Sequence, residues 1–344
     1  MASPLSDLLD RLLEKQNLAE REAAELLQSL AAPGIAPALA GALLGALRAK
    51  GVSATELRGF AAGMRALARR PHIASPVRAV DIVGTGGDRS GSLNLSTGAA
   101  LLTAACGVPV VKHGNRALSS RAGSADVLEA LGVAISLDER GAGACFAATG
   151  FAFLFAPHYH PAMANIGPVR SALGVRTIFN ILGPLTNPAE PSFQVIGAYN
   201  QPTAELMAQA LVGTNVERAL VIHGASGWDE PTPIGPFELF EVRAGAVRRE
   251  RRDPADYGLA PCQAADLAGA DAAYNARQLQ RALTGEEHGA LRDALMLGTA
   301  LALEVSGVET APRLAIARAA EAIDSGRAGA LLDQLTRFDP TKSA

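Results

Sequence analysis

Apolar residues in the first seventy positions recur with the period of a helix. In the first segment the leucines fall three or four positions apart: Leu5, Leu8, Leu9, Leu12 and Leu13. Further Ala- and Leu-rich segments follow, one ending near Gly51, since glycine is favoured just after a helix. Pro71 closes the last of them. The pattern predicts an all-helical region at the start of the chain.

Two local features refine these helices. Asn17 with Glu20, and Ser53 with Glu56, have the spacing of capping boxes, so each pair predicts the start of a helix. One helix also carries small residues at helical spacing: Ala38, Ala42, Gly45 and Ala49. Such a stripe allows close packing, and it is either internal core or the face of a dimer.

From position 77 short apolar runs alternate with helical segments. The predicted strands are Val80–Val83, Val108–Val111, Val133–Leu137, Phe151–Phe155, Val195–Tyr199, Ala219–Ile222 and Phe237–Val242. The predicted helices between them are Thr97–Cys106, Ala125–Leu131, Gly141–Thr149 and Glu205–Leu211, and the last seventy residues are mostly helical. This alternation predicts a mostly parallel sheet covered by helices, with right-handed crossovers.

A Pro-, Asn- and Gly-rich passage, Pro157–Pro188, interrupts the alternation and contains one predicted helix, Pro161–Leu173. We expect this passage to return to the helical domain. The fold class is therefore α/β, with a small all-helical domain of residues 1–72 and about 163–190. The larger α/β domain takes residues 73–162 and 191–344.

Composition narrows the functional classes. The 344 residues carry a net charge of −3. The chain therefore lacks the excess of basic residues that would indicate a nucleic acid or an anionic membrane as partner. Cys106, Cys145 and Cys262 lie far apart, which excludes a disulfide scaffold and indicates a reducing, cytoplasmic location. Proline or glycine interrupts the longest uncharged stretches, so we expect no membrane span.

A glycine-rich loop after the first predicted strand carries the densest chemical signal. Its glycines, Gly84, Gly86, Gly87 and Gly91, let backbone N–H groups approach an anion. Asn94, Ser96 and Thr97 follow at a helix start, where the helix dipole favours a phosphate. Arg89 breaks the dinucleotide fingerprint and Ser92 replaces the lysine of a P-loop. The loop is a phosphate cradle or an ordinary strand–helix turn.

Two further loops leave strand ends at the same predicted edge of the sheet. The loop over 112–126 supplies basic groups and hydroxyls: Lys112, Arg116, Arg121, Ser119, Ser120 and Ser124. In the other, Asp229 and Glu230 are adjacent carboxylates that suit Mg²⁺ if phosphates lie opposite, although most such pairs are surface turns.

The interrupting passage contains residues of a different kind. His158 and His160 lack a third ligand, so they do not predict a zinc site. Arg170 could clamp a carboxylate between the two domains, whereas we expect Arg176 to form a structural ion pair.

In series these segments resemble the anthranilate phosphoribosyltransferase family. The motifs are D-I-V-G-T-G-G-D…N-L-S-T, K-H-G-N-R-A-L-S-S, G-S-A-D-V-L-E-A-L-G, F-A-P-x-x-H-P-A-M, R-T-I-F-N-I-L-G-P-L-T-N-P and G-x-D-E. The resemblance implies Mg²⁺-dependent transfer of phosphoribose from phosphoribosyl pyrophosphate (PRPP) to anthranilate, in tryptophan biosynthesis. It also implies a homodimer formed through the helical domain. The sequence departs from the usual motifs of this family at Ser92, Leu118, Arg89 and Trp228.

The resemblance implies site residues one by one. The PRPP contacts would be Gly84, Gly87, Asp88, Ser92, Asn94, Leu95, Ser96, Thr97, Lys112, His113, Gly114, Asn115, Arg116, Ala117, Leu118, Ser119, Ser120 and Ser124. Anthranilate would contact Gly84, Asn115 and Arg170, and two Mg²⁺ ions would use Ser96, Asp229 and Glu230. No acid or base is assigned, and His113 is a weak candidate for the proton acceptor.

Three other functions stay open. A pyrimidine nucleoside phosphorylase resembles this family in fold but uses inorganic phosphate. An inactive paralogue would bind nucleic acid or a regulatory ligand. A transferase could also act on another aromatic amine or acid.

Overall fold

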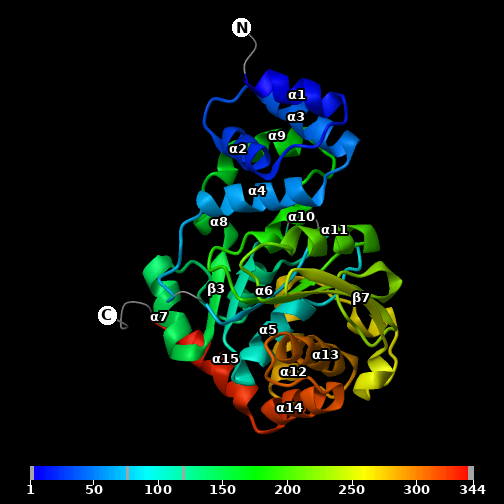
Figure 1. Cartoon of the computed structure of the whole chain (residues 1–344). Coiled ribbons are helices and arrows are strands. Elements are labelled where there is room, and N and C mark those ends of the chain that lie inside the picture. The colour runs from blue at the N-terminus through cyan, green and yellow to red at the C-terminus, as the bar shows by residue number, and fades with distance from the viewer. Residues whose placement is uncertain (1–3, 75–76, 118–120, 340–344) are drawn as a thin grey trace.

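The structure is a computed structural model that describes residues 4–74, 77–117 and 121–339. Figure 1 shows a smaller bundle of helices at the N-terminal end and a larger part in which helices cover both faces of a sheet. The predicted fold class, a helical domain joined to an α/β domain with a mostly parallel sheet, is confirmed.

The helical bundle combines N-terminal helices with helices from the middle of the chain. They are α1 (Pro4–Leu13), α2 (Glu20–Ala31), α3 (Pro37–Lys50), α4 (Ala54–Ala66), α9 (Met163–Leu173) and α10 (Phe179–Leu182). Helix α9 packs on α2 and α3, and α10 packs on α4. A Cβ on Gly59 would lie 2.2 Å from the Glu20 carbonyl oxygen, so this glycine lets α4 approach α2 closely. The residues after 160 thus lie beside the N-terminal helices.

One predicted capping box is confirmed and the other is wrong. Ser53 Oγ accepts from the Glu56 N–H at 3.2 Å, and the Glu56 carboxylate accepts from the Ser53 N–H at 2.8 Å. Helix α2 instead begins at Glu20, where Glu22 accepts from the Ala19 N–H at 2.8 Å. The Asn17 side chain accepts from Lys50 Nζ at 2.7 Å. The Asn17 amide, which was expected to cap α2, therefore binds Lys50 at the end of α3 instead.

The sheet runs in the order β3-β2-β1-β4-β5-β6-β7. Its strands are β1 (Val80–Gly84), β2 (Val110–Gly114), β3 (Phe151–Phe155), β4 (Phe193–Gly197), β5 (Arg218–His223), β6 (Phe237–Arg243) and β7 (Ala246–Arg252). Strands β1 to β5 pair in parallel, and β6 is antiparallel to both of its neighbours, β5 and β7. Strand β1 lies between β2 and β4, so the winding direction reverses there, which is where ligands bind in such sheets.

Two strand predictions differ from the structure. Residues 133–137 form no strand: Val133, Ile135 and Leu137 are buried and alternate with exposed residues, but the segment pairs with no strand in the described part of the chain. An alternation of apolar and polar residues indicates that one side of a segment is buried, but it does not show that the segment pairs with another strand. Strand β7 was not predicted, because its sequence is dominated by arginines and reads as a solvated segment.

Helices cover the two faces of the sheet. They are α5 (Leu95–Ala105), α6 (Ser124–Ala130), α7 (Glu139–Thr149), α8 (Ala156–Tyr159), α11 (Gln201–Leu211), α12 (Ala272–Leu283), α13 (Ala290–Val305), α14 (Pro312–Asp324) and α15 (Arg327–Arg337). Figure 1 shows α11 on the side facing the bundle, with α5 and α12 to α15 on the other side. Helix α5 packs on α13 and on β1, and Ser96 in its first turn lies 3.5 Å from the Lys112 ammonium of β2. Its first turn therefore lies at the edge where the predicted loops meet.

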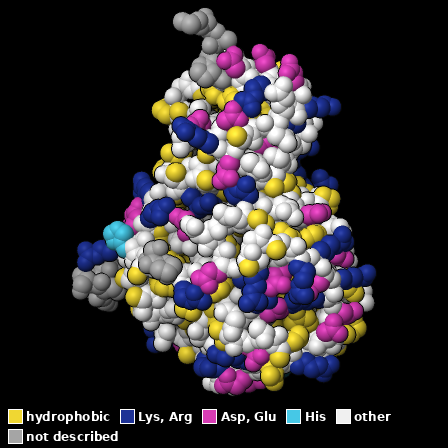
Figure 2. Space-filling model, viewed as in Figure 1, with side chains coloured by type: hydrophobic (Ala, Val, Ile, Leu, Met, Phe, Trp, Pro, Cys, Tyr) yellow, Lys and Arg dark blue, Asp and Glu magenta, His cyan; other side chains and the backbone are white. Residues whose placement is uncertain are grey.

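Two predictions concern the surroundings of the chain. Among the described residues, no helix combines the length and the apolar character needed to cross a membrane. All three cysteines are unpaired, with Cys106 and Cys145 buried. On the face in Figure 2, basic and acidic side chains are interspersed rather than gathered into one large basic patch.

Candidate active site

The acidic segment after β5 crosses the end of β4 to reach β1. Strand β4 ends at Gly197, where a Cβ would lie 1.6 Å from the Asp229 carbonyl oxygen. A Cβ on Gly84, the last residue of β1, would lie 2.4 Å from Asp229 Oδ2. Glycine at both positions leaves room for the crossing. The two loops that the sequence placed at one edge are therefore in direct contact.

Asp229 holds the glycine loop by its backbone and its side chain. Asp229 Oδ2 accepts from the Gly86 N–H at 2.5 Å, and the Asp229 N–H donates to Asp88 Oδ2 at 3.2 Å. Asp88 also accepts from the Ser90 hydroxyl at 3.0 Å. Burial, and then the Asp88 charge, raise the pKa of Asp229 to about 7. Two carboxylates this close favour a cation between or beside them.

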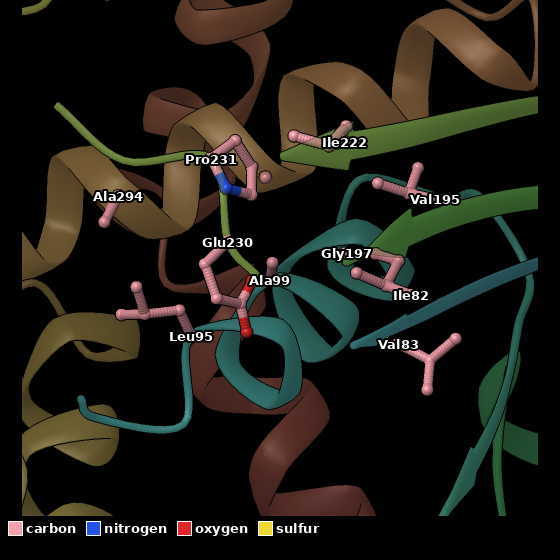
Figure 3. A pocket seen from close by; sticks show the side chains of 11 residues that line it. Ile82, Val83, Leu95, Ala99, Val195, Gly197, Ile222, Glu230, Pro231 and Ala294 are labelled. Atoms are coloured by element: carbon pink, nitrogen blue, oxygen red, sulfur yellow. The ribbon is translucent and has the colours of Figure 1, made fainter. Parts of the chain in front are cut away.

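Glu230 faces the first turn of α5. Its Oε1 accepts from the Ser96 N–H at 3.1 Å, where the helix dipole favours a negative charge. Figure 3 shows the Glu230 side chain beside a small cavity lined by apolar residues, among them Ile82, Leu95 and Ala294. Burial in these surroundings, and then Asp229, raise the pKa of Glu230 to about 8. The site therefore concentrates buried carboxylates that bound cations would stabilise.

Lys112 brings the second predicted loop into the same place. Its side chain is buried, and Nζ donates to the Ile82 carbonyl at 2.5 Å and to Ser96 Oγ at 3.5 Å. Burial lowers the pKa of Lys112 below its usual value, although the charges of Asp81 and Glu230 oppose this shift. The glycine loop, Lys112 on β2 and the Asp229–Glu230 pair thus lie at one edge of the sheet, as the sequence predicted.

Asp81 and Asn187 brace the strands beneath this edge, and neither was predicted as a site residue. Asn187 Nδ2 donates to Asp81 Oδ2 and to the Val111 carbonyl, both at 2.8 Å. The His113 N–H donates to Asp81 Oδ1 at 3.3 Å. Burial raises the pKa of Asp81 to about 6. A charged residue in the middle of an apolar strand was the available signal.

Of the predicted contacts at the start of α5, the Asn94 side chain is engaged within the protein, and Leu95 and Thr97 are buried. Asn94 Nδ2 donates to the Ala122 carbonyl at 3.1 Å, and Asn94 Oδ1 accepts from Asn275 at 2.9 Å. Thr97 is fully buried, with no hydrogen-bond partner for its hydroxyl among the described residues. Leu95, one residue after Asn94, is buried in the apolar core. These side chains shape the helix start rather than project from it.

The loop after β2 is held by internal contacts. Arg116 pairs with Asp126 at 2.9 Å and Glu129 at 2.7 Å, and these partners raise its pKa. The Ser124 hydroxyl donates to the Asn115 carbonyl at 3.3 Å, and Gly114 leaves room for it. The Ala117 N–H donates to Asp126 at 2.9 Å. Leu118, Ser119 and Ser120 lie outside the described residues.

His113 is buried beside His160, with ring centroids 5.0 Å apart. Burial, and then His160, lower the pKa of His113 to about 3. The imidazole is therefore neutral at pH 7 and a poor proton acceptor. His158 lies 3.6 Å from Glu139, on the outer side of this pair.

The two arginines of the interrupting passage differ in their contacts. Arg170 lies over the Phe179 ring at 5.0 Å, and burial lowers its pKa. Arg176 was expected to form an ion pair, but within the described chain no carboxylate lies within ion-pair distance of it. Its guanidinium donates to the Gly87 carbonyl and lies over the Tyr199 ring at 4.2 Å. Arg176 thus contacts the glycine loop itself.

The chain is similar to known proteins over nearly its whole length. Residues 76–329 match the model described as "Glycosyl transferase family, a/b domain", and residues 6–68 match "Glycosyl transferase family, helical bundle domain". An anthranilate phosphoribosyltransferase from Methylobacterium nodulans is 46% identical, over 92% of this chain and 94% of the relative. One from Rubrobacter xylanophilus is 43% identical, over 97% of each. The chain belongs to the anthranilate phosphoribosyltransferase family.

Solved structures of the family share the fold over nearly the whole chain. The anthranilate phosphoribosyltransferase of Thermus thermophilus superposes with a TM-score of 0.90 at 41% identity, covering 96% of this chain and 98% of that one. The enzyme of Saccharomyces cerevisiae in complex with PRPP and Mg gives 0.89 at 26% identity, covering 99% and 98%. Trp228, a departure from the family motif, is 5% exposed and packs in the core.

Proposed function

We propose that the protein transfers the phosphoribosyl group of PRPP to the amine of anthranilate and releases pyrophosphate. This is the second step of tryptophan biosynthesis from chorismate. The observation that carries the proposal is the meeting of Asp229 and Glu230 with the glycine loop and Lys112 at the switch point of the sheet. Such a site suits a ligand with several phosphates and their divalent cations.

The glycine loop and the loop after β2 would bind PRPP. The proposed contacts are Gly84, Gly87, Asp88, Ser92, residues 94–97, residues 112–120 and Ser124. Backbone N–H groups of the loop and the first turn of α5 suit phosphate oxygens. The Lys112 ammonium adds a positive charge that Ser96 orients. The engaged side chains of Asn94 and Arg116 would act mainly by holding these loops in place.

The acidic residues fit Mg²⁺. Asp229 is buried and Glu230 is half-buried; burial first, and then a neighbouring carboxylate (Asp88 for Asp229, Asp229 for Glu230), raises the pKa of each. Within the described chain, no three His, Cys, Asp or Glu side chains cluster closely enough to hold a metal alone. Mg²⁺ commonly completes its coordination with water and substrate phosphates, so two carboxylates and Ser96 are sufficient. We propose two ions per subunit; bound there, they would neutralise charge developing on the leaving pyrophosphate.

The chemistry requires electrostatic help and orientation. Breaking the C1–O bond leaves a cationic sugar and an anionic pyrophosphate, and Lys112 with the loop N–H groups would stabilise the anion. The neutral aryl amine attacks C1 from the opposite face, with inversion, and the proton that the new C–N nitrogen then loses passes to water or to the released pyrophosphate. Arg170 would hold the anthranilate carboxylate and orient the amine, with Gly84 and Asn115 beside it. An aryl amine needs no strong base, and we assign none.

The assembly and location follow as parts of the same proposal. We propose a homodimer formed by the helical domain, residues 1–72 and about 163–190. The stripe of small residues on α3 supports a dimer face, because Ala38, Ala42 and Ala49 are exposed and Gly45 has open space around it. Leu13 on α1 is 65% exposed. The three unpaired cysteines agree with a cytoplasmic location.

The test is a direct assay. The pure protein is incubated with PRPP, Mg²⁺ and anthranilate, and loss of anthranilate fluorescence is followed. Turnover that requires all three components is expected; no loss of fluorescence with anthranilate but turnover with substituted benzoates would reassign the acceptor. Phosphorolysis of thymidine or uridine, or salt-sensitive DNA binding without turnover, would replace the proposal by one of the other readings.

A further inference from the structure

We propose that Arg176 is a positioning residue that sets the shape of the glycine loop and links this shape to the helical bundle. The inference rests on the proposed function, because it takes the ligand of the loop to be a pyrophosphate group. Arg176 lies in the turn between α9 and α10, on the bundle side of the site. None of the assigned ligand contacts includes it.

Two contacts place the Arg176 guanidinium. It donates to the Gly87 carbonyl, and it lies 4.2 Å from the centroid of the Tyr199 ring. Gly87 has φ +77°, and a Cβ there would lie 3.1 Å from Arg176 Nη2. Glycine at this position thus provides both the left-handed backbone and the space for the guanidinium.

The loop is held from two opposite sides. On one side, the Asp229 carboxylate accepts from the Gly86 N–H and the Asp229 N–H donates to the Asp88 carboxylate. On the other side, Arg176 donates to the carbonyl of Gly87, which lies between Gly86 and Asp88 in the chain. In a trans peptide the C=O and the following N–H point in opposite directions. Fixing the Gly87 carbonyl on Arg176 therefore directs the Asp88 N–H away from Arg176. This orientation decides which N–H groups of the loop are available to an anion.

A second hydrogen bond extends the contact into the bundle. Arg48, on α3, donates to the Arg176 carbonyl. The Tyr199 N–H in turn donates to Thr85 Oγ1 at 3.2 Å, which ties the stacked ring to the start of the glycine loop. A continuous path thus runs from α3 through Arg176 to Gly87. A shift of the bundle relative to the sheet would reach the phosphate-binding backbone through this path.

The charge of Arg176 also remains available. Throughout residues 4–74, 77–117 and 121–339, no carboxylate lies within ion-pair distance of it. Its partners are the Tyr199 ring and one carbonyl, both uncharged, so the guanidinium keeps a positive charge beside the loop. An anion bound by the loop would gain from that field.

The test compares R176Q, R176K and R48Q with the control R78Q. Arg78 also stacks on an aromatic ring, Phe193 at 5.1 Å, but pairs with Glu217 at the opposite end of β4. Binding of pyrophosphate with Mg²⁺ is measured by calorimetry, and KM for PRPP and anthranilate by steady-state kinetics. We expect R176Q to weaken pyrophosphate binding and raise the PRPP KM by about tenfold, the effect of losing one charged hydrogen bond.

The other variants separate positioning from general stability. R176K should recover part of the loss, because an ammonium can donate to the Gly87 carbonyl but cannot stack as a plane. R48Q should raise the PRPP KM by a smaller factor, and R78Q should leave pyrophosphate binding unchanged. R48Q keeps the test decisive if R176Q does not fold, since unchanged binding in R48Q and R176K would overturn the inference.

Three results would each overturn the proposed role of Arg176. Wild-type pyrophosphate affinity in a folded R176Q, or an equal loss in R78Q, overturns the positioning role. An increase only in the anthranilate KM does so as well. If wild-type protein binds pyrophosphate but does not consume PRPP with anthranilate, the proposed function fails while the calorimetric comparison still tests Arg176.

Discussion

Gly197 lies directly against Asp229: a Cβ at position 197 would come within 1.6 Å of the Asp229 carbonyl oxygen. Strand β4 therefore ends where the acidic segment must pass on its way to β1. Because the obstacle is backbone, the segment cannot give way by rotating a side chain.

Replacing this glycine should displace the acidic pair. We expect Gly197→Ala to lower PRPP turnover at least about tenfold and to cost about 1–3 kcal/mol of unfolding free energy, as overpacking does. Gly167→Ala is the control, because a Cβ there meets nothing within 4 Å. Full activity in a folded Gly197→Ala protein would contradict the crossing.

Arg170 should govern the acceptor alone. Losing a charge-assisted clamp costs about 1.5–3 kcal/mol, so Arg170→Ala should raise the anthranilate KM by about ten- to a hundredfold. The PRPP KM should change little, because the glycine loop does not depend on this side chain. Steady-state kinetics with each substrate varied in turn provide the measurement. An unaltered anthranilate KM would remove Arg170 from the acceptor site.

The acidic pair should be required for metal-dependent turnover but not for folding. In Asp229→Asn with Glu230→Gln, the amides keep the shape of the carboxylates and relieve their repulsion. We expect Mg²⁺-dependent turnover to disappear while the thermal midpoint stays equal or rises. A titration of activity against Mg²⁺, beside a melting curve, tests both. Near-normal turnover at any Mg²⁺ concentration would exclude this metal site.

The buried histidines should make the protein sensitive to acid. Burial lowers the pKa of His160 to about 4, so between about pH 6.5 and 4 the unfolded chain holds a proton that the folded chain does not. Stability from this histidine is present above that window and falls, as pH drops through it, by about 1.4 kcal/mol per pH unit.

Urea unfolding at a series of pH values tests this. His160→Gln should flatten the acid limb by that slope, and His288→Gln, at an exposed position, should not. Identical acid limbs for His160→Gln and the wild type would contradict the assignment.

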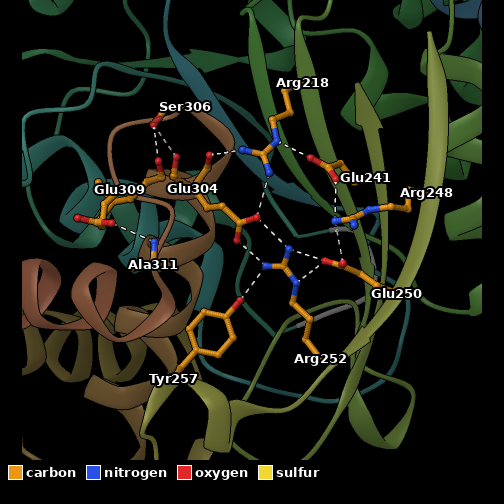
Figure 4. Close-up of polar contacts among 12 residues, drawn as sticks. Arg218, Glu241, Arg248, Glu250, Arg252, Tyr257, Glu304, Ser306, Glu309 and Ala311 are labelled. Carbon is orange, nitrogen blue, oxygen red and sulfur yellow. Dashed lines mark hydrogen bonds and ion pairs between the residues drawn. The ribbon is translucent and has the colours of Figure 1, made fainter. Parts of the chain in front are cut away.

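The arginine–glutamate network around Glu304 should contribute to stability rather than to turnover. Figure 4 shows Glu304 between Arg218 and Arg252, which donate to it at 3.0 and 2.8 Å. Removing a buried partner leaves desolvated charge, so Glu304→Ala should cost about 3 kcal/mol of unfolding free energy.

The matched control is Glu321→Ala, whose partner Arg327 is exposed, and it should cost less than about 1 kcal/mol. The PRPP KM of folded Glu304→Ala protein should equal that of the wild type. Equal costs in the two variants would show that burial does not strengthen the network.

The sequence predicted this fold where local patterns and tertiary structure agree. The strand Phe151–Phe155 has the predicted bounds, since a short apolar run flanked by breakers has few alternatives. Loops after parallel strands were expected at one edge, and there Asp229 does meet the glycine loop, while Lys112 meets Ser96 in the first turn of α5. That part of the site follows from topology alone.

What the sequence did not predict depends on contacts between distant residues. The amide of Asn17 is taken by Lys50, and the cap of α2 moves to Ala19 and Glu22. Arg176 was expected to pair with a carboxylate, but its partner is the carbonyl of Gly87. A backbone acceptor leaves no signature in composition or spacing, so only the folded chain reveals it.

Strand β7 has one long side without a neighbouring strand in the described chain, and it carries four arginines against one glutamate. Glutamates of the same chain pair with Arg248, Arg249 and Arg252, so another copy laid along this rim would have to desolvate or displace these paired charges. The charged rim therefore opposes growth of the sheet from molecule to molecule, the route to insoluble assemblies.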